Sequence, residues 1–276
     1  MDPRPSPSGI LPIAKSMLDG WDLPGHGDPY FDCGITLVRG CENIHLHPAG
    51  VDGRPAGVVF VQLYRRCCAR AECPVCYEGW ASKEASKAEH RIRSFKPAKF
   101  RRPIHVIASV PKSDLGVEFG EIRRLAQKIV KNAGVYGGCC IYHPKRQDST
   151  SKLWYFSPHF HFIGYGWVRG TEHIFESSGW VVKNAGVRKS VRATLHYILS
   201  HAGVKRGRHT ITWFGVLSYN KLRVPKVIEL PPRCPICMAE LKPLPESLIG
   251  GLDPPPEFGD YWFKSSHGLV RWVPSD

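Results

Sequence analysis

Residues 157–164 alternate between two kinds of side chain, as a β-strand does. Successive side chains of a strand point to opposite faces of its sheet, so His159 and His161 share one face while Phe160 and Phe162 fill the other. The pattern predicts a strand that holds two imidazoles side by side, in the arrangement of two ligands to one divalent ion. The alternative is a strand whose histidines face solvent, and an isolated His-x-His more often has that explanation.

Residues 188–203 have a helical period instead. Apolar side chains recur at three- and four-residue spacing and form a stripe that would face a core: Val191, Leu195, Ile198 and Ala202. No proline interrupts the segment, and Gly203 stands where a helix end favours glycine, so one helix is predicted over 189–202. Tyr197 and His201 lie one turn apart on the flank of the stripe, from which a side chain can reach into a site. For any single tyrosine, the default is instead the edge of the core with its hydroxyl in water.

The chain around these two segments has an order that is typical of the α+β class. Alternating or apolar runs predict four strands, at about 103–110, 135–143, 157–165 and 209–217. Further helices are predicted at 77–93 and 118–132. Neighbouring strands in this order can pair as antiparallel hairpins, so we expect an α+β fold with an antiparallel sheet.

His143 is the candidate for a third metal ligand. It ends the strand in which Cys139 and Ile141 share its face, and it would lie beside the histidine pair if the two strands are adjacent. The connection over 145–152 is long, so the register between the strands stays open. The alternative is a histidine at the start of a loop, bonded to the backbone.

Ten cysteines change the picture of the flanking regions. The turns 73–76 and 234–237 both read Cys-Pro-x-Cys, which is typical of a zinc knuckle because the tight turn aims two thiolates at one tetrahedral ion. The first turn needs two more ligands, for which the candidates are Cys33, Cys41, Cys67, Cys68, His45 and His47. The second turn has no later cysteine pair, so its partners come from earlier in the chain or from histidines such as His209 and His267.

The charge indicates the class of partner. Lys and Arg number 38 against 24 Asp and Glu, a formal net charge of +14, which favours a polyanion such as nucleic acid or an anionic membrane. No run of about eighteen apolar residues occurs, so we expect no membrane span. Cysteines arranged as metal ligands are typical of a reducing compartment, which places the protein in the cytosol.

Five segments occur in a fixed order along the chain: HVIASVPK at 105–112, CCIYHPKR at 139–146, SPHFHFIGYGW at 157–167, LHYILSHAG at 195–203 and WFGVLSYNKL at 213–222. Together they resemble the HUH endonuclease superfamily, and within it the rolling-circle replication initiators of archaeal plasmids and viruses. The resemblance spans about residues 30–240. It also favours Cys68 over Cys67 as a zinc ligand, so the expected structural zinc ligands are Cys33, Cys41, Cys68, Cys73, Cys76, Cys234 and Cys237.

The resemblance implies a central antiparallel sheet with helices on one side, flanked by zinc-binding elements. His159 and His161, with His143, would hold Mn²⁺ or Mg²⁺, with Zn²⁺ as a further candidate. Tyr197 would nick single-stranded origin DNA, form a 5′-phosphotyrosine and later rejoin the ends. Many relatives have a lysine one turn after the tyrosine, where this chain has His201, which would orient the phosphate or act on the proton of the tyrosine or leaving group.

The same resemblance sets the expected organisation and partners. We expect a tail at 1–20, a zinc-binding region with a basic helix at 21–100, the endonuclease domain at 101–222 and a second knuckle with a Pro-rich, aromatic tail at 223–276. The sequence contains no Walker phosphate loop, so helicase work would need a host helicase beside the host polymerase, in the cytosol of an archaeon that carries the plasmid or virus. Tyr219 lies beyond the next strand and is expected to be structural.

The sequence is also compatible with two other functions. A transposase or relaxase would use the same HUH chemistry on other DNA. A zinc-stabilised nucleic-acid-binding protein without catalysis would use the histidines to complete structural zinc sites.

Overall fold

The computed structural model describes residues 20–30, 32–41, 43, 46–47, 58–100, 102–225, 230–244, 262–265 and 268–272. The chain forms two compact units. The larger unit comprises Met1–Pro29 and Ala69–Pro225, and the smaller comprises Tyr30–Cys68 and Lys226–Asp276. Each contains one five-stranded sheet in which all neighbouring strands pair antiparallel, so the expected α+β class is confirmed.

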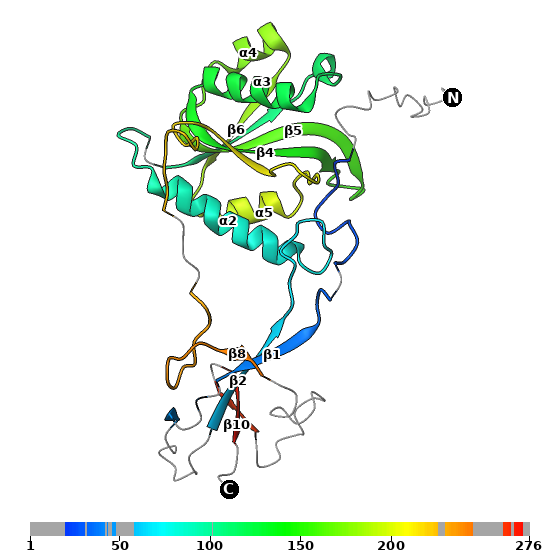
Figure 1. Ribbon diagram of the computed structural model, residues 1–276. Coiled ribbons are helices and arrows are strands. Elements are labelled where there is room, and N and C mark those ends of the chain that lie inside the picture. Colours follow the sequence, from blue (N-terminus) through cyan, green and yellow to red (C-terminus); the bar gives the residue numbers. More distant parts are fainter. Residues whose placement is uncertain are drawn as a thin grey trace, which may run out of the picture. The chain divides into compact units, whose positions relative to one another are not determined.

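The sheet of the larger unit has the long strand β5 at its centre (Figure 1). Its strands, in spatial order, are β6 (Val181–Val187), β3 (Ile104–Ser109), β5 (Trp154–Gly166), β4 (Val135–Gln147) and β7 (Ile211–Gly215). A central strand is hydrogen-bonded to a neighbouring strand on each side, so both neighbours fix its register. Side chains on β5 are therefore held more rigidly than side chains on an edge strand or a loop.

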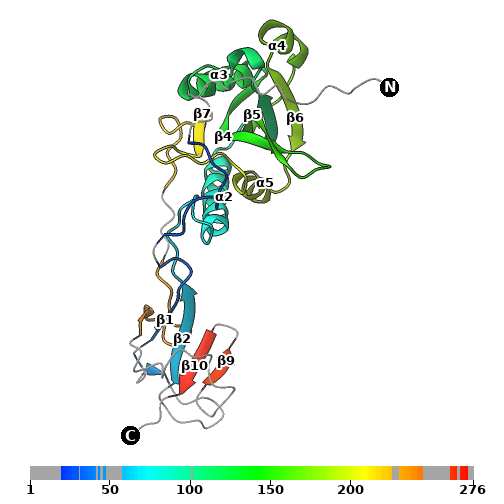
Figure 2. The same cartoon turned by 90° about the vertical axis from the view of Figure 1, so that its right-hand side faces the viewer.

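Helices cover both faces of this sheet (Figures 1 and 2), which corrects the expectation of helices on one side. One face carries α3 (Phe119–Asn132) and α4 (Thr171–Ser178), and the other carries α2 (Tyr77–Ser94) and α5 (Val191–Leu199). The central strand buries apolar side chains on both faces, because Phe160 and Phe162 lie on one and Ile163, beyond the histidines, lies on the other, and all three are fully buried. Each face must be removed from water, so each needs its own layer of helices.

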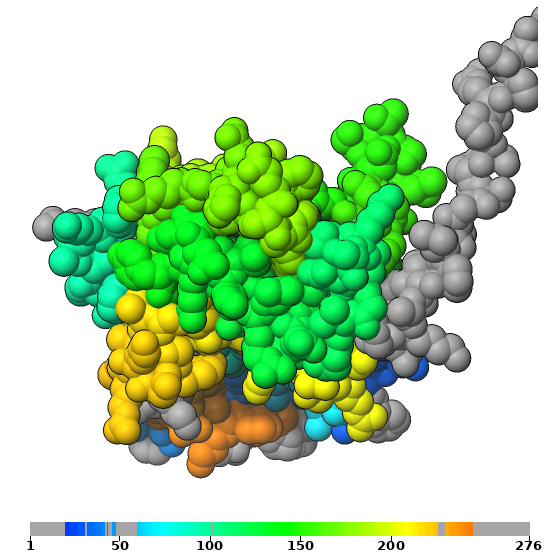
Figure 3. Space-filling view, turned by 90° about the horizontal axis from the view of Figure 1, so that it is seen from above, coloured from blue at the N-terminus to red at the C-terminus, as the bar shows by residue number. Residues whose placement is uncertain are grey.

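Figure 3 views the unit from the side of α3 and α4, whose side chains close that face of the sheet. A short 3₁₀ helix, η2 (Lys112–Asp114), precedes α3. Helix α3 is capped by the Glu118 carboxylate, which accepts hydrogen bonds from the backbone N–H groups of Gly120 and Glu121. None of the helices in the described ranges is long and apolar enough to cross a membrane.

The smaller unit joins segments from both ends of the chain. Its sheet has the order β8 (Lys242–Pro243), β1 (Thr36–Gly40), β2 (Val58–Arg65), β10 (Gly268–Trp272) and β9 (Trp262–Ser265). Figure 2 shows β10 between β2 and β9. The boundaries of the compact units therefore differ from the domain ranges expected from the sequence. Helix α2, from the expected range 21–100, packs on the larger sheet, and strands from 21–100 and 223–276 form one sheet together.

The helix α5 is shorter than its sequence pattern indicates. It begins after Ser190, whose hydroxyl accepts the Ala193 N–H at 3.2 Å, and it ends at Leu199 rather than near 202. Gly203 is not its cap, since its φ is not positive. Its backbone N–H donates to the Tyr142 carbonyl at 2.7 Å, and a Cβ there would lie 3.1 Å or less from three side chains. The glycine is needed for this close approach.

Candidate metal centre and nucleophile

A hairpin places three histidines on one face of the larger sheet. In the β4–β5 ladder, His143 lies opposite His159, and Ile141 lies opposite His161. The ligand-capable nitrogens of the three histidines all lie within 4.8 Å of one another. The structure therefore brings His143 beside the pair, as the strand alternation predicts.

The turn between the two strands explains how the register is set. Strand β4 runs to Gln147, into the connection expected over 145–152, and β5 begins at Trp154, three residues before the strand expected at 157. Asp148 begins a tight turn between them. Its carboxylate accepts the N–H groups of Thr150 at 3.0 Å and of Ser151 at 2.7 Å. Such an Asx turn fixes which residues face each other along the hairpin.

Two of the three imidazoles have their tautomer set by a backbone carbonyl. The Nδ1 of His159 lies 2.7 Å from the carbonyl oxygen of Ser157, so it carries the proton and leaves Nε2 with a lone pair. His143 bonds the carbonyl of Ile198, and among the described residues its buried Nε2 has no hydrogen-bond partner. A buried nitrogen with a lone pair and no partner is costly unless something binds it, so this arrangement fits a metal ion.

Burial also keeps these histidines neutral, which is the form that binds metal. Desolvation lowers the pKa of His143 and of His161 well below the usual value, and the neighbouring imidazoles lower it further. Desolvation also lowers the pKa of His159, to about 4. At neutral pH an ion therefore does not have to displace a second proton from these rings.

His161 is held by a chain of two hydrogen bonds. Its Nδ1 lies 2.7 Å from the Nε2 of His105 on β3, and the Nδ1 of His105 lies 2.9 Å from a guanidinium nitrogen of Arg188. Burial, and then the Arg188 charge, lower the pKa of His105 to about 4. The sequence interpretation did not single out either residue, although His105 begins one of the five segments and shares the alternation of β3.

The helix α5 and the turn that follows it bring two further side chains to this cluster. The His201 ring lies 4.7 Å from that of His143 and 4.7 Å from that of Tyr197, measured between ring centroids. Burial lowers the pKa of His201, which favours a neutral ring that accepts a proton over a charged ring that binds phosphate. Tyr197 is 69% exposed, so its hydroxyl is open to a large substrate beside the histidines.

Tyr219 lies in a different environment. Its ring is 70% exposed and packs under the Arg91 guanidinium, whose central carbon is 4.4 Å from the ring centroid. Ring contacts join Tyr197 to the histidine cluster through His201, whereas among the described residues no ring contact joins Tyr219 to it. A structural role for Tyr219 stays a prediction.

The cysteines form two four-ligand groups that suit structural zinc. The first group is Cys33, Cys68, Cys73 and Cys76, and the second is Cys41, His47, Cys234 and Cys237. In the second group, His47 Nε2 lies 3.2 Å from the Cys237 sulfur and 3.4 Å from the Cys234 sulfur. Burial alone raises the pKa of Cys237, but hydrogen bonds from the Ala239 backbone, His47 and Cys41 outweigh it and lower the pKa. Burial raises the pKa of Cys41 in the same group to about 12, so a thiolate there needs the charge of a bound ion.

These groups revise the ligand assignment made from the sequence. Cys41 was a candidate for the first knuckle and belongs to the second group, and His47, also weighed for the first, completes the second. Cys67 is exposed and His209 belongs to neither group. His45 and His267 lie outside the described residues.

No family model, curated protein or solved structure matches this chain.

Proposed function

We propose that the protein nicks and rejoins single-stranded DNA with Tyr197 as the nucleophile and a divalent ion held by three histidines, as an HUH-type rolling-circle replication initiator does. One observation carries the proposal: three neutral, buried histidines converge on a sheet face beside a helix that presents an exposed tyrosine. The five ordered segments that resemble archaeal initiators support it from the sequence side.

The histidines His143, His159 and His161 would hold the ion through their Nε2 atoms. When bound, the ion would polarise a non-bridging phosphate oxygen and offset the charge that develops during in-line attack. Three imidazoles suit Mn²⁺ or Zn²⁺ better than Mg²⁺, which prefers oxygen ligands. Because three protein ligands leave a coordination position open, the group differs from the two closed cysteine groups.

Tyr197 would supply the nucleophile. Its phenolic oxygen forms a bond to phosphorus while the bond from phosphorus to the 3′ oxygen breaks, which leaves a 5′-phosphotyrosine and a 3′-hydroxyl that a host polymerase can extend. The neutral His201 ring, 4.7 Å from the tyrosine ring, is placed to accept the phenolic proton and to return it to the 3′ oxygen. The adduct keeps the energy of the diester, so the reverse reaction rejoins ends.

The charge of the chain fits the same function. A net charge of +14 favours a polyanionic substrate, and no Walker loop occurs, so strand separation would fall to a host helicase. A transposase or relaxase would use the same residues and would differ in the DNA it recognises.

A zinc-stabilised binding protein without catalysis is the alternative from another class. Under that alternative the histidines would complete structural zinc sites. Each cysteine group already has four ligands without them, so the histidine group has no structural zinc site left to complete. This observation favours the enzyme.

The test captures the covalent adduct from a randomised pool of DNA, so the sequence that the protein recognises does not have to be known in advance. A randomised pool of single-stranded oligonucleotides, labelled at the 3′ end, is incubated with protein and Mn²⁺ and then boiled in detergent. We expect label to remain with the protein, chelator to prevent this, and Tyr197→Phe to abolish it. Tyr219→Phe is the matched control and should keep the adduct. A pool that yields no adduct with the unmodified protein in Mn²⁺ or Zn²⁺ contradicts the proposed function.

A further inference from the structure

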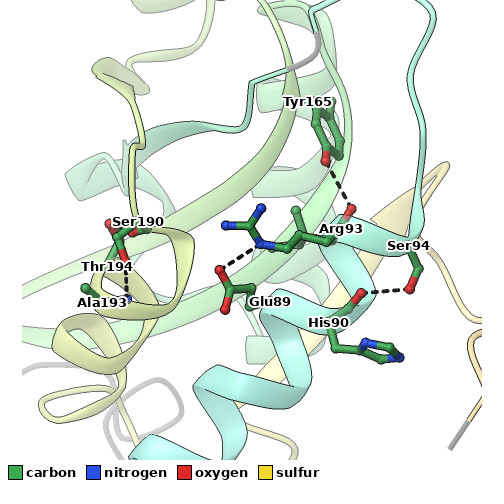
Figure 4. A network of polar contacts seen from close by, with 9 residues as sticks. Glu89, His90, Arg93, Ser94, Tyr165, Ser190, Ala193 and Thr194 are labelled. Atoms are coloured by element: carbon green, nitrogen blue, oxygen red, sulfur yellow. Dashed lines mark hydrogen bonds and ion pairs between the residues drawn. The ribbon is translucent and has the colours of Figure 1, made fainter. Parts of the chain in front are cut away.

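A cavity of about 880 Å³ lies in the larger unit, on the same sheet face as the histidines. It is bounded by the end of α2, by Tyr165 near the end of β5, and by the segment that leads from β6 into α5. Figure 4 shows Arg93 and Glu89 at the end of α2, Tyr165 close to them, and Ser190 and Thr194 at the start of α5. Cavities of this size accommodate small organic ligands, so one nucleotide fits.

The wall of this cavity is strongly basic. Five cations line it and no lining residue is acidic: Arg93, Lys96, Arg102, Arg188 and Lys189. Arg93 is paired with Glu89 at 2.9 Å. For Lys96, Arg102 and Lys189, the part of the chain that the structure describes offers no carboxylate within ion-pair distance. Gathered charge of one sign without counter-charges attracts an anion.

The other lining side chains are aromatic or apolar. The rings of Phe95 and Tyr165 lie 5.7 Å apart, and Tyr165 is buried with its hydroxyl donating to the Ile92 carbonyl at 3.0 Å. Phe95 is only partly buried, so part of its ring remains open. An aromatic surface beside unpaired cations matches the two halves of a nucleotide, the base and the phosphate.

Hydrogen bonds link the wall of the cavity to the candidate metal site. Arg188, in the cavity wall, donates to His105, and His105 is hydrogen-bonded to His161. Tyr165 lies four residues after His161 in β5, which corresponds to roughly 13 Å. Stacked nucleotides advance about 3.4 Å each, so a strand would cover this distance within about four nucleotides.

We propose that this cavity holds a nucleotide of the single-stranded DNA that flanks the cleaved bond. Its phosphate is bound by Lys96, Arg102 and Lys189, and its base stacks on Phe95. The proposal rests on the proposed function, since it takes single-stranded DNA to be the substrate. It assigns to the cavity the task of positioning the strand, at a fixed distance from Tyr197.

The test compares two triple variants of equal charge change. The cavity variant replaces Lys96, Arg102 and Lys189 with Gln, and the control variant replaces Lys112, Lys128 and Arg169 with Gln. All six side chains are exposed, and the control residues lie outside the cavity lining. Thermal melting verifies that both variants fold. If the cavity variant does not fold, the single variants Lys96→Gln and Lys189→Gln are judged by the same criterion.

Binding is measured by fluorescence anisotropy with a short labelled oligothymidylate, between about 50 and 200 mM salt. Each cation that no longer neutralises a phosphate should reduce the slope of log Kd against log salt by about 0.7, and should weaken binding about fivefold at about 0.1 M salt. The slope of the cavity variant should fall by one to three such steps, whereas the control should keep the slope of the unmodified protein. Equal reductions in both triple variants, or none in either, overturn the proposal.

Two competitors separate a bound strand from a free small anion. Thymidine monophosphate and inorganic phosphate are each titrated against both triple variants. If the cavity variant changes affinity for either competitor but not for the oligothymidylate, the cavity is a small-anion site and the proposal is wrong. The two proposals can fail separately. An adduct with an unchanged salt slope in the cavity variant contradicts only the cavity proposal. A reduced salt slope without an adduct contradicts only the nicking reaction and leaves the cavity as a site for single-stranded DNA.

Discussion

Replacing Arg188 with Met is expected to strengthen metal binding at the histidines, although Arg188 is hydrogen-bonded to their neighbour. A guanidinium can only donate, so the Nδ1 of His105, 2.9 Å away, must accept. The proton of His105 then lies on Nε2 and is donated to the Nδ1 of His161 at 2.7 Å. This leaves the proton of His161 on Nε2, where an ion would bind.

Metal binding therefore has to reverse this chain. Once the Nε2 of His161 binds an ion, its Nδ1 carries the proton, the Nε2 of His105 accepts it, and the Nδ1 of His105 carries a proton that faces Arg188. The hydrogen bond to the guanidinium can then no longer form. A hydrogen bond to a charged group contributes about 1.5–3 kcal/mol, and each 1.4 kcal/mol is about tenfold in affinity.

The variant Arg188→Met removes this penalty, so we expect the Kd for Mn²⁺ to fall by about 10- to 150-fold. Isothermal titration calorimetry of the protein with Mn²⁺ measures it directly. Lys189→Met is the matched control, since it removes one neighbouring charge without touching His105, and it reports how much of the gain is simple relief of charge repulsion.

His105→Phe should act in the opposite direction. It leaves the Nδ1 proton of His161 without an acceptor, and the loss of such an outer hydrogen bond typically costs about 10- to 100-fold in metal affinity. If Arg188→Met weakens Mn²⁺ binding, or equals Lys189→Met, the assignment of protons along this chain is wrong.

Three further predictions concern the zinc groups, the histidines and the charge. Cys234→Ala should release one zinc equivalent and unfold the smaller unit, because structural zinc contributes folding free energy, whereas Cys67→Ala should retain the metal. Atomic absorption measures the zinc content and thermal melting measures the stability of both variants. Equal zinc content in the two variants would contradict the grouping of the cysteines. His159→Ala should lose Mn²⁺ binding in calorimetry yet keep its fold by circular dichroism, and a collapse of melting temperature like that of Cys234→Ala would mark the histidines as a structural site. Affinity for single-stranded DNA should fall steeply with salt through counterion release, and a slope near zero would assign the charge of +14 to another partner.

Local patterns predicted the elements that form the site. The alternation in β5 placed His159 and His161 on one face, and the stripe of α5 placed Tyr197 on its flank, because both depend only on the period of the backbone. His201 was predicted on the same helix but lies in the turn after it, and its ring still contacts that of Tyr197. Strand β6 was not predicted, since it is an edge strand whose side chains are mostly exposed, so it has little apolar alternation.

What the sequence could not supply is pairing between distant segments. His47 and Cys234 are 187 residues apart, and nothing local to either indicates that they share an ion. The register of His143 against His159 depends on where the Asp148 turn begins, which the pattern of either strand alone does not reveal. The second layer of helices is required because β5 buries apolar side chains on both faces, whereas the resemblance implied helices on one side.

The identity of the nucleophile is tested most directly by mass spectrometry of the covalent complex after nuclease and trypsin digestion. Trypsin separates the two candidate tyrosines, because Tyr197 falls in the peptide 193–205 and Tyr219 in the peptide 209–221. The account predicts that peptide 193–205 gains the mass of a nucleotide, with fragmentation that places it on Tyr197, and that peptide 209–221 stays unmodified. A nucleotide on Tyr219 or on any other residue, or an unmodified peptide 193–205 in a complex that survives boiling, would contradict it.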